Sequence, residues 1–274
     1  MSIKKAIKQI LFRLKLLNVI SPSRASEVEF VNEKKRISSL PRYTEGIFSF
    51  GNERIKFPDS ASFLMMYDEI IEKQIYNFNP STDKPCIIYC GANIGLGIIY
   101  LKRKFPKASI TGFEADKKIF KILLENINYY GYNDIKLINK AVWNDETTVK
   151  FFSEGADGSR IACSGDTDNL TETETTRLVQ YLDKKVDLLI MDIEGAEYTV
   201  INDCKEYLRN VDNLFIEYHS FLKEKQSLHG LLAILAENNF RYYIYHNGVV
   251  QNNPFIKIGS YFSIDSHLNI FAIR

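Results

Sequence analysis

The chain has 274 residues, which is enough for one large core and a short appendage. Its apolar share of 45% and charged share of 25% are typical of a soluble globular protein, so disordered, collagen-like and disulfide-rich classes are excluded. The formal net charge is only +1, but residues 1–42 hold ten Lys or Arg against three Glu, so a basic arm precedes a mildly acidic body. An acidic body argues against a nucleic acid as partner.

The segment 3–19 predicts a basic amphipathic helix, because its apolar residues recur at helical spacing and its Lys and Arg lie elsewhere around the helix. Two roles stay open for residues 1–20: peripheral binding to the inner face of an anionic membrane, or packing on the domain or on a partner. Ser21-Pro22-Ser23 ends the helix, and the polar, basic segment up to Pro41 predicts a linker. Residues 1–42 therefore form a first unit.

A small extension is predicted over residues 43–83. Apolar and aromatic residues from Tyr43 to Phe57 flank Gly51-Asn52, which is typical of a short hairpin. Pro58-Asp59-Ser60 is able to cap a helix that runs to Tyr76.

From residue 84 onward, apolar runs alternate with helical stretches, the pattern of βαβ units and a parallel sheet. The predicted strands are Cys86–Cys90, Ser109–Phe113, Ile135–Val142, Val186–Met191, Asn213–Tyr218, Arg241–Tyr245 and Leu268–Ile273. The predicted helices are Leu96–Lys104, Lys117–Tyr129, Ala196–Leu208 and Gln226–Asn238. The polar segment Ser153–Thr173 predicts a long loop that serves as a lid or binding surface. We therefore predict an α/β fold for residues 84–274, with a seven-stranded, mostly parallel sheet and helices on both faces.

The four cysteines predict free thiols. They form no CxxC pair and no His cluster accompanies them, so the pattern does not predict a structural zinc site. Cys86 and Cys90 lie four apart on one predicted strand, with Cα atoms roughly 13 Å apart, which is too far for a disulfide. No stretch approaches a transmembrane helix, and residues 1–20 lack the features of a signal peptide, so we expect a cytoplasmic protein.

The first strand of the sheet ends in a glycine turn, Gly91-Ala92-Asn93-Ile94-Gly95, that opens a helix. Glycines let a ligand approach the backbone closely, and a helix N-terminus offers N–H groups to an anion. The spacing differs from the G-x-G-x-x-G that fits a pyrophosphate, so a dinucleotide cofactor is disfavoured. Glu114 ends the next strand, 23 positions after Gly91, where a carboxylate is able to accept both hydroxyls of an adenosyl ribose. Helix–strand packing remains the alternative explanation for the glycines.

A second group of polar residues follows the strand Val186–Met191. Asp192, Glu194 and Glu197 open the next helix, and like charges so close predict that at least one is protonated, paired or bound to a cation. Helix capping is the alternative. Glu217 and His219 end the next strand at the same edge of the sheet, where an imidazole is able to take a proton near neutral pH.

In order and spacing, these motifs resemble the FkbM family of S-adenosylmethionine-dependent methyltransferases, especially members found with bacterial surface-glycan genes. The matching runs are Pro58-Asp59, Ile75-Tyr76-Asn77-Phe78, Cys90-Gly91-Ala92-Asn93-Ile94-Gly95, Phe113-Glu114-Ala115-Asp116, Asn126-Ile127, Ala141-Val142, Asp157-Gly158-Ser159-Arg160, Val186-Asp187-Leu188-Leu189, Met191-Asp192-Ile193-Glu194-Gly195-Ala196-Glu197 and Ile216-Glu217-Tyr218-His219-Ser220. The run from Asp192 to Glu197 is the most specific. The chain differs from the family at Tyr89, where Asp is usual, and at Ala115, where Pro is common.

The resemblance implies a Rossmann-like class I methyltransferase fold that binds S-adenosylmethionine and releases S-adenosylhomocysteine. It also implies the cofactor contacts: the methionine end on Gly91, Asn93 and Gly95, the ribose on Glu114, the adenine on the backbone near Ala141 and Val142, and Asp192 beside the cofactor.

The predicted function is O-methylation of a sugar hydroxyl in a bacterial surface glycan, capsule or lipopolysaccharide, or in its precursor. In this hypothesis His219 takes the hydroxyl proton, Asp192 orients the acceptor or the imidazole, and Glu217 supports the acceptor or a cation. A bound divalent metal is compatible with these residues but is not predicted. The alternatives are methylation of another metabolite or atom, and a catalytically silent binding subunit, which Tyr89 favours.

Overall fold

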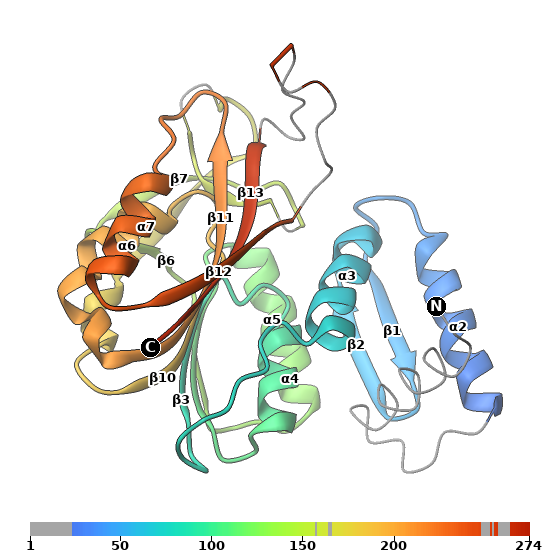
Figure 1. Cartoon of the computed structure of the whole chain (residues 1–274). Helices are drawn as coiled ribbons and strands as arrows, with labels where there is room; N and C mark the ends of the chain where they lie inside the picture. Colours follow the sequence, from blue (N-terminus) through green and yellow to red (C-terminus); the bar gives the residue numbers. More distant parts are fainter. Residues whose placement is uncertain (1–23, 157, 164–165, 248–252, 254, 257–263) are drawn as a thin grey trace.

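A seven-stranded sheet forms the centre of the computed structural model, which describes residues 24–156, 158–163, 166–247, 253, 255–256 and 264–274 (Figure 1). The strand order is β12-β13-β11-β10-β3-β4-β5, and all these strands run in one direction except β13, which is antiparallel to both neighbours. The strands are β3 (Cys86–Cys90), β4 (Ser109–Phe113), β5 (Ile135–Ile138), β10 (Val186–Met191), β11 (Val211–Phe221), β12 (Arg241–His246) and β13 (Ile264–Ile273). The predicted α/β class and mostly parallel sheet are confirmed, whereas the predicted helix 3–19 lies outside the described residues.

Helices cover both faces of this sheet, as predicted. They are α4 (Leu96–Lys104), α5 (Lys117–Tyr129), α6 (Glu197–Cys204) followed by the 3-10 helix η3 (Lys205–Asn210), and α7 (Leu228–Glu237). Side chains alternate along β3, so Ile87 and Tyr89 join the core under α4 and α5, while Ile88 and Cys90 join the core under α6 and α7. A parallel sheet buried on both faces explains why its strands are continuous apolar runs.

A second, four-stranded sheet departs from the prediction. Its order is β6-β9-β7-β8, with β6 (Ala141–Trp143), β7 (Thr148–Phe152), β8 (Arg160–Ile161) and β9 (Leu170–Arg177), the last followed by the 3-10 helix η2 (Leu178–Tyr181). The strand predicted over Ile135–Val142 is therefore divided between β5 and β6. The predicted loop Ser153–Thr173 contains β8 and half of β9.

The polar sequence of β9 concealed it. Thr173 and Thr175 face inward and are 3% and 2% exposed, while Glu172 and Glu174 alternate with them on the solvent side. The Thr175 hydroxyl donates to the carbonyl of Asp145, so its burial leaves no unpaired donor. Threonine supplies the β-branched shape of a strand residue without an apolar signal.

The N-terminal extension consists of α2 (Arg24–Ser38), the hairpin β1 (Gly46–Phe50) and β2 (Glu53–Phe57), α3 (Ser60–Met66) and a π-helix, η1 (Tyr67–Lys73). The hairpin around Gly51 and the cap at Asp59 are confirmed, since the Asp59 carboxylate accepts the Ser62 N–H. The linker predicted up to Pro41 is wrong, because it contains helix α2. This helix buries Phe30 and Ile37 against the aromatic residues of the hairpin and η1, a partner surface that local sequence does not reveal.

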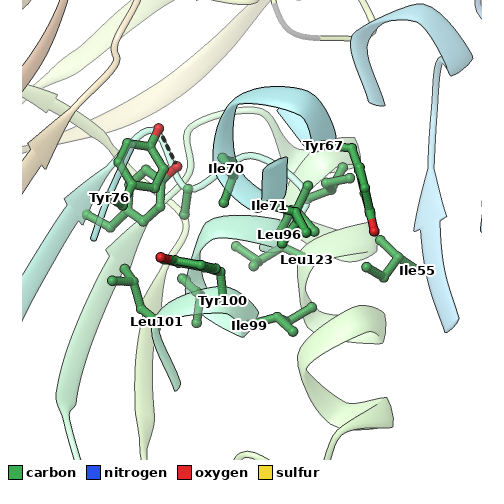
Figure 2. Packing of buried hydrophobic residues seen from close by; sticks show 14 of the residues in the cluster. Ile55, Tyr67, Ile70, Ile71, Tyr76, Leu96, Ile99, Tyr100, Leu101 and Leu123 are labelled. Atoms are coloured by element: carbon green, nitrogen blue, oxygen red, sulfur yellow. Dashed lines mark hydrogen bonds between the residues drawn. The ribbon is translucent and has the colours of Figure 1, made fainter. Parts of the chain in front are cut away.

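The extension packs on α4 and α5, to the right in Figure 1. Figure 2 shows Ile70 and Ile71 of η1 next to Leu96 of α4 and Leu123 of α5. The fully buried Asn126 of α5 links the extension to the sheet domain through hydrogen bonds. Its side chain accepts the Lys56 N–H at 2.8 Å and donates to the carbonyls of Lys56 and Ile94. Within the described part of the chain, no helix is long and apolar enough to cross a membrane.

Candidate functional site

A cleft opens beyond the carboxyl ends of β3, β4 and β10, the position where ligands bind in open parallel sheets because connections diverge there. The cleft and the open solvent at its mouth together hold about 580 Å³ of space between protein atoms. The lining residues are Gly91, Asn93, Phe113, Glu114, Ala115, Lys140, Ala141, Val142, Phe151, Ala156, Ser159, Ile161, Asp192, Ile193, Glu194 and Ala196.

Gly91 forms the floor of this cleft. Its φ of +84° is a left-handed conformation, and a Cβ atom there would lie 1.7 Å from the backbone oxygen of Asp192. The Gly91 N–H donates to the Phe113 carbonyl at 3.0 Å, and the Asp192 N–H donates to the Cys90 carbonyl at 3.0 Å. The ends of three strands are thus locked together at a point where only glycine fits.

Glu114 stands on the next strand end with its carboxylate fixed by the backbone. One oxygen accepts the Asn93 N–H at 2.9 Å and the other accepts the Asp116 N–H at 2.8 Å. The side chain is 8% exposed, and burial raises its pKa to about 7 although the two N–H bonds lower it. Each oxygen keeps a second lone pair, so this carboxylate is able to accept the two hydroxyls of a ribose.

The cleft brings together the other residues predicted to hold the cofactor, with one exception. Asn93, Ala141, Val142 and Asp192 all line it, and Phe113 and Phe151 add apolar walls suited to a flat ring. Gly95 is not among the lining residues. It begins α4 with φ +87°, and a Cβ there would meet the side chain of Leu123 at 2.6 Å, so its absence of a side chain serves helix packing.

The segment after β7 forms one wall of the cleft, and none of its residues was predicted individually as a site residue. Ala156, Ser159 and Ile161 line the cleft, in agreement with the predicted binding surface. The hydroxyls of Ser153 and Ser159 both contact the Asp116 carboxylate, which also caps α5. The family-like run 157–160 was the sequence signal for this wall. The hydrogen bonds of this wall to Asp116 could not be predicted from the sequence.

The turn after β10 gathers acidic residues around His219. Glu194 has φ +54° and Gly195 φ +99°, a tight turn in which the Glu197 carboxylate accepts the Gly195 N–H at 2.9 Å. The two imidazole nitrogens of His219 lie between carboxylates, with Nε2 3.6 Å from Glu194 and Nδ1 3.5 Å from Glu197. His219 and Asp192, predicted from separate strand ends, therefore belong to one cluster with Glu194 and Glu197.

The charges of this cluster alter each other's ionisation. Burial lowers the pKa of His219, but Glu194 and Glu197 raise it more, so it lies well above its usual value. Burial raises the pKa of Asp192 well above its usual value, and the nearby Glu217 and Glu194 add to this effect. The Asp192 Oδ1 atom is buried and has no hydrogen-bond partner in the described structure.

His267 is the residue that sequence reading missed. The pairing of β11 with β13 places His267 opposite His219, with ring centroids 4.4 Å apart. Nε2 of His267 forms a hydrogen bond with the Glu217 carboxylate. Burial raises the pKa of Glu217, but the hydrogen bond to His267 and the charges of His219 and His267 together outweigh it, so the pKa falls below its usual value. Only the long-range register of the last strand produces this pair, and no local pattern signals it.

The extension also reaches this region through its π-helix. Glu69 is 7% exposed, and burial together with the charge of Glu217 raises its pKa to about 7. Asn247 donates to Glu217 at 3.2 Å and is a hydrogen-bond partner of Glu69 as well. A π-helix is frequent at functional sites, and here it places a carboxyl group behind the strand that carries Glu217 and His219.

Comparison with known proteins identifies the family. Residues 90–242, more than half of the chain, match the methyltransferase FkbM domain. The chain belongs to the FkbM methyltransferase family. Methyltransferase 1 of Beauveria bassiana (strain ARSEF 2860) is 22% identical over 178 residues, which cover 56% of this chain and 72% of that protein. Methyltransferase sdnD of Sordaria araneosa is 37% identical over 62 residues, which cover 23% of this chain and 24% of that protein.

Solved structures with similar folds include the methyltransferase FkbM from Methylobacillus flagellatus KT. It is 14% identical with a TM-score of 0.46, and the match covers 90% of this chain and 60% of that chain. M. jannaschii TYW2, solved in complex with AdoMet, is 17% identical with a TM-score of 0.47, and the match covers 85% of this chain and 87% of that chain.

Tyr89, where the FkbM family usually has Asp, points away from the cleft. It is 3% exposed in the core under α4, and its hydroxyl shares a 3.1 Å hydrogen bond with that of Tyr76. Figure 2 marks a hydrogen bond of the labelled Tyr76 with a dashed line. A Cβ on Gly97 would lie 2.4 Å from its ring. The tyrosine therefore packs the base of the glycine turn instead of placing a charge there.

Proposed function

We propose that this FkbM-family methyltransferase uses S-adenosylmethionine to methylate a hydroxyl group of a sugar, in a bacterial surface glycan such as capsule or lipopolysaccharide or in a precursor of one. The observation that carries the proposal is the cluster around His219: Asp192 and Glu194 line the cleft, and His219 links them to Glu217, although neither His219 nor Glu217 is among the lining residues. Imidazole and carboxylate groups are suited to binding and deprotonating a hydroxyl. The choice of a sugar rests on the resemblance to family members found with surface-glycan genes.

The cleft fits the cofactor by its chemistry. Glu114 offers lone pairs to the ribose hydroxyls, the Gly91 turn admits the methionine end without side-chain obstruction, and Ala141 and Val142 present backbone and small side chains to the adenine. When bound, S-adenosylmethionine supplies a methyl group on a sulfonium: its C–S bond breaks, the electron pair stays on sulfur, and a C–O bond forms to the acceptor.

The remaining task of the protein is to align the acceptor and to dispose of its proton. Holding the two reacting atoms ~3 Å apart in line accounts for most of the acceleration, and proton removal contributes ~10²–10⁴-fold. In the assignment made from the sequence, His219 takes the proton, Asp192 orients the acceptor or the imidazole, and Glu217 supports the acceptor. His219 lies close to Asp192 in one group and to Glu217 in another, where β11 runs past the carboxyl end of β10.

A variant series tests this function. His219→Ala should lower kcat by ~10²–10⁴ and leave the affinity for S-adenosylhomocysteine nearly unchanged, since the residue acts on the acceptor. His229→Ala is the matched control, because this exposed histidine of α7 does not line the cleft. Glycan from a strain that lacks the gene, measured by mass spectrometry, should lack one methyl group per repeat. Unchanged glycan mass would exclude the glycan acceptor.

A silent binding subunit is the second candidate, favoured by Tyr89 at the usual acidic position. Thermal unfolding with and without S-adenosylmethionine separates the two, because a ligand at 100 times its Kd stabilises a protein by ~2.7 kcal/mol. Absence of any shift would favour the silent subunit. Methylation of another small metabolite or atom is the third candidate, since the fold does not fix the acceptor.

We further propose a cytoplasmic enzyme whose residues 1–20 lie on the inner face of the membrane. The basic, amphipathic sequence of this segment supports the proposal, and a lipid-linked glycan precursor would be presented at the same surface.

A further inference from the structure

Three possible ligand atoms converge at the acceptor side of the cleft. One atom each of Asp192, Glu194 and His219 lies within 4.8 Å of the others. Asp192 ends β10, Glu194 follows in the tight turn, and His219 comes from β11, so two strand ends and one strained turn produce the convergence. Two carboxylates and one imidazole suit Mg²⁺ or Mn²⁺, which favour oxygen ligands and accept a histidine.

The hydrogen bonding of Asp192 and His219 is incomplete. The His219 side chain is 2% exposed, yet its Nδ1 has no hydrogen-bond partner among the described residues, and its Nε2 is 3.6 Å from the nearest Glu194 oxygen. Asp192 Oδ1 is buried and unbonded in the same part of the structure. Buried polar atoms are nearly always hydrogen-bonded, so the Asp192 Oδ1 atom points to a missing ligand, whereas Nδ1 of His219 faces Glu197. Ligand atoms ~2.1 Å from one octahedral ion lie ~3 Å from each other, so binding would draw these atoms together from their present spacing of up to 4.8 Å.

The Glu197 carboxylate orients the imidazole ring of His219. A histidine bound to a metal by one nitrogen directs the other N–H to a carboxylate, which fixes the ring. The Glu197 carboxylate, 0% exposed, lies 3.5 Å from Nδ1 of His219 and is itself held by the Gly195 N–H at 2.9 Å. Nε2 is therefore the nitrogen that faces Asp192 and Glu194.

Charge balance favours a cation as the ligand. Four carboxylates, those of Asp192, Glu194, Glu197 and Glu217, surround two imidazoles in a largely buried region. Even with both imidazoles protonated, the group carries excess negative charge when the acids are ionised. Buried carboxylates are costly unless they are paired or coordinate a metal.

We propose that Asp192, Glu194 and His219 bind one divalent cation, Mg²⁺ or Mn²⁺, that holds the acceptor hydroxyl. This inference rests on the proposed transfer to a hydroxyl. A bound cation lowers the pKa of that hydroxyl, so its proton passes to solvent water while the oxygen attacks the methyl carbon. Two neighbouring hydroxyls of a sugar ring would fill adjacent coordination positions. In this refinement His219 holds the ion, and solvent water replaces it as the proton acceptor of the proposed function.

Direct binding of Mn²⁺ to the whole chain tests the site. After EDTA treatment and its removal, calorimetry and electron paramagnetic resonance should show one Mn²⁺ per chain, displaced by excess Mg²⁺. Glu194→Gln and His219→Ala should each weaken binding at least tenfold, and Glu197→Gln, which removes only the supporting carboxylate, should weaken it ~10–100-fold. Glu172→Gln, an exposed carboxylate on β9, is the matched control and should bind as the wild type does.

The outcomes separate this site from the proposed function. No Mn²⁺ or Mg²⁺ binding by wild-type protein that still binds S-adenosylhomocysteine would overturn the cation site, as would full methyl transfer in EDTA. Cation binding that is lost in the three variants supports the site. If that binding is found but no hydroxyl is ever methylated, the proposed function fails and the cation site stands. Far-UV circular dichroism of each variant confirms that lost binding is not lost folding.

Discussion

Replacing Gly91 by alanine should damage the protein far more than the same change at Gly131. Both glycines have positive φ, +84° and +68°, so alanine costs ~1–2 kcal/mol at either position. A Cβ on Gly131 would meet nothing within 4 Å, whereas one on Gly91 would lie 1.7 Å from the Asp192 oxygen. The strand ends would have to separate by more than ~1 Å, and overpacking of this kind adds ~1–3 kcal/mol. The expected losses are roughly 2–5 kcal/mol for Gly91→Ala and ~1–2 kcal/mol for Gly131→Ala.

Urea unfolding, followed by far-UV circular dichroism and by the fluorescence of Trp143, measures both losses. Calorimetry with S-adenosylhomocysteine adds a second readout, because only Gly91 lines the cleft. Gly91→Ala should lose binding, and Gly131→Ala should keep it. Equal midpoints for the two variants together with unchanged affinity would refute the close contact between the ends of β3 and β10.

Three further predictions concern the cofactor, the extension and the N-terminus. Glu114→Ala should weaken S-adenosylhomocysteine binding by ~1.5–3 kcal/mol. Because burial raises the Glu114 pKa to about 7, the carboxylate is protonated as the pH drops from 8 to 6, and the wild-type affinity should fall over this range. Calorimetry of Glu114→Gln should show no such dependence on pH. Asn126→Ala should lower the free energy of unfolding by at least ~1–3 kcal/mol, since it strands buried groups of Lys56 and Ile94, while the exposed Asn128→Ala should cost little in the same urea titration. Removal of residues 1–20 should abolish salt-sensitive binding to anionic vesicles, to which each basic side chain adds up to ~1 kcal/mol; equal flotation of both proteins would make the segment a packing element.

The parallel sheet was predictable because its strands are buried on both faces. Runs such as Val186–Met191 are apolar except for Asp187, and helix α5 has a strong helical periodicity of apolar residues. The second sheet was not predictable from the sequence, because β9 alternates threonine with glutamate and pairs with strands that lie far from it along the chain. Helix α2 was missed for the same reason: its buried face exists only against the hairpin.

The cofactor side of the site was more predictable than the acceptor side. Gly91 and Glu114 stand at the ends of consecutive strands, so local pattern alone places them in one crevice. His267 reaches Glu217 only through an antiparallel strand at the end of the chain, and Glu69 only through the packing of the extension. Long-range register and domain packing carry no signature in a short window of sequence.

The contact between Tyr89 and Gly97 limits how this site is able to change during evolution. Any side chain at position 97 would collide with the tyrosine ring, and restoring an aspartate at position 89 would leave a void beside Tyr76 and an unneutralised charge in the core. Each substitution alone should lower the stability of the protein, so we expect positions 89 and 97 to change together. We therefore expect aspartate at position 89 to lower the free energy of unfolding in this core, and a loop grafted from a protein with aspartate there should be accepted only when the strand and the helix are exchanged together.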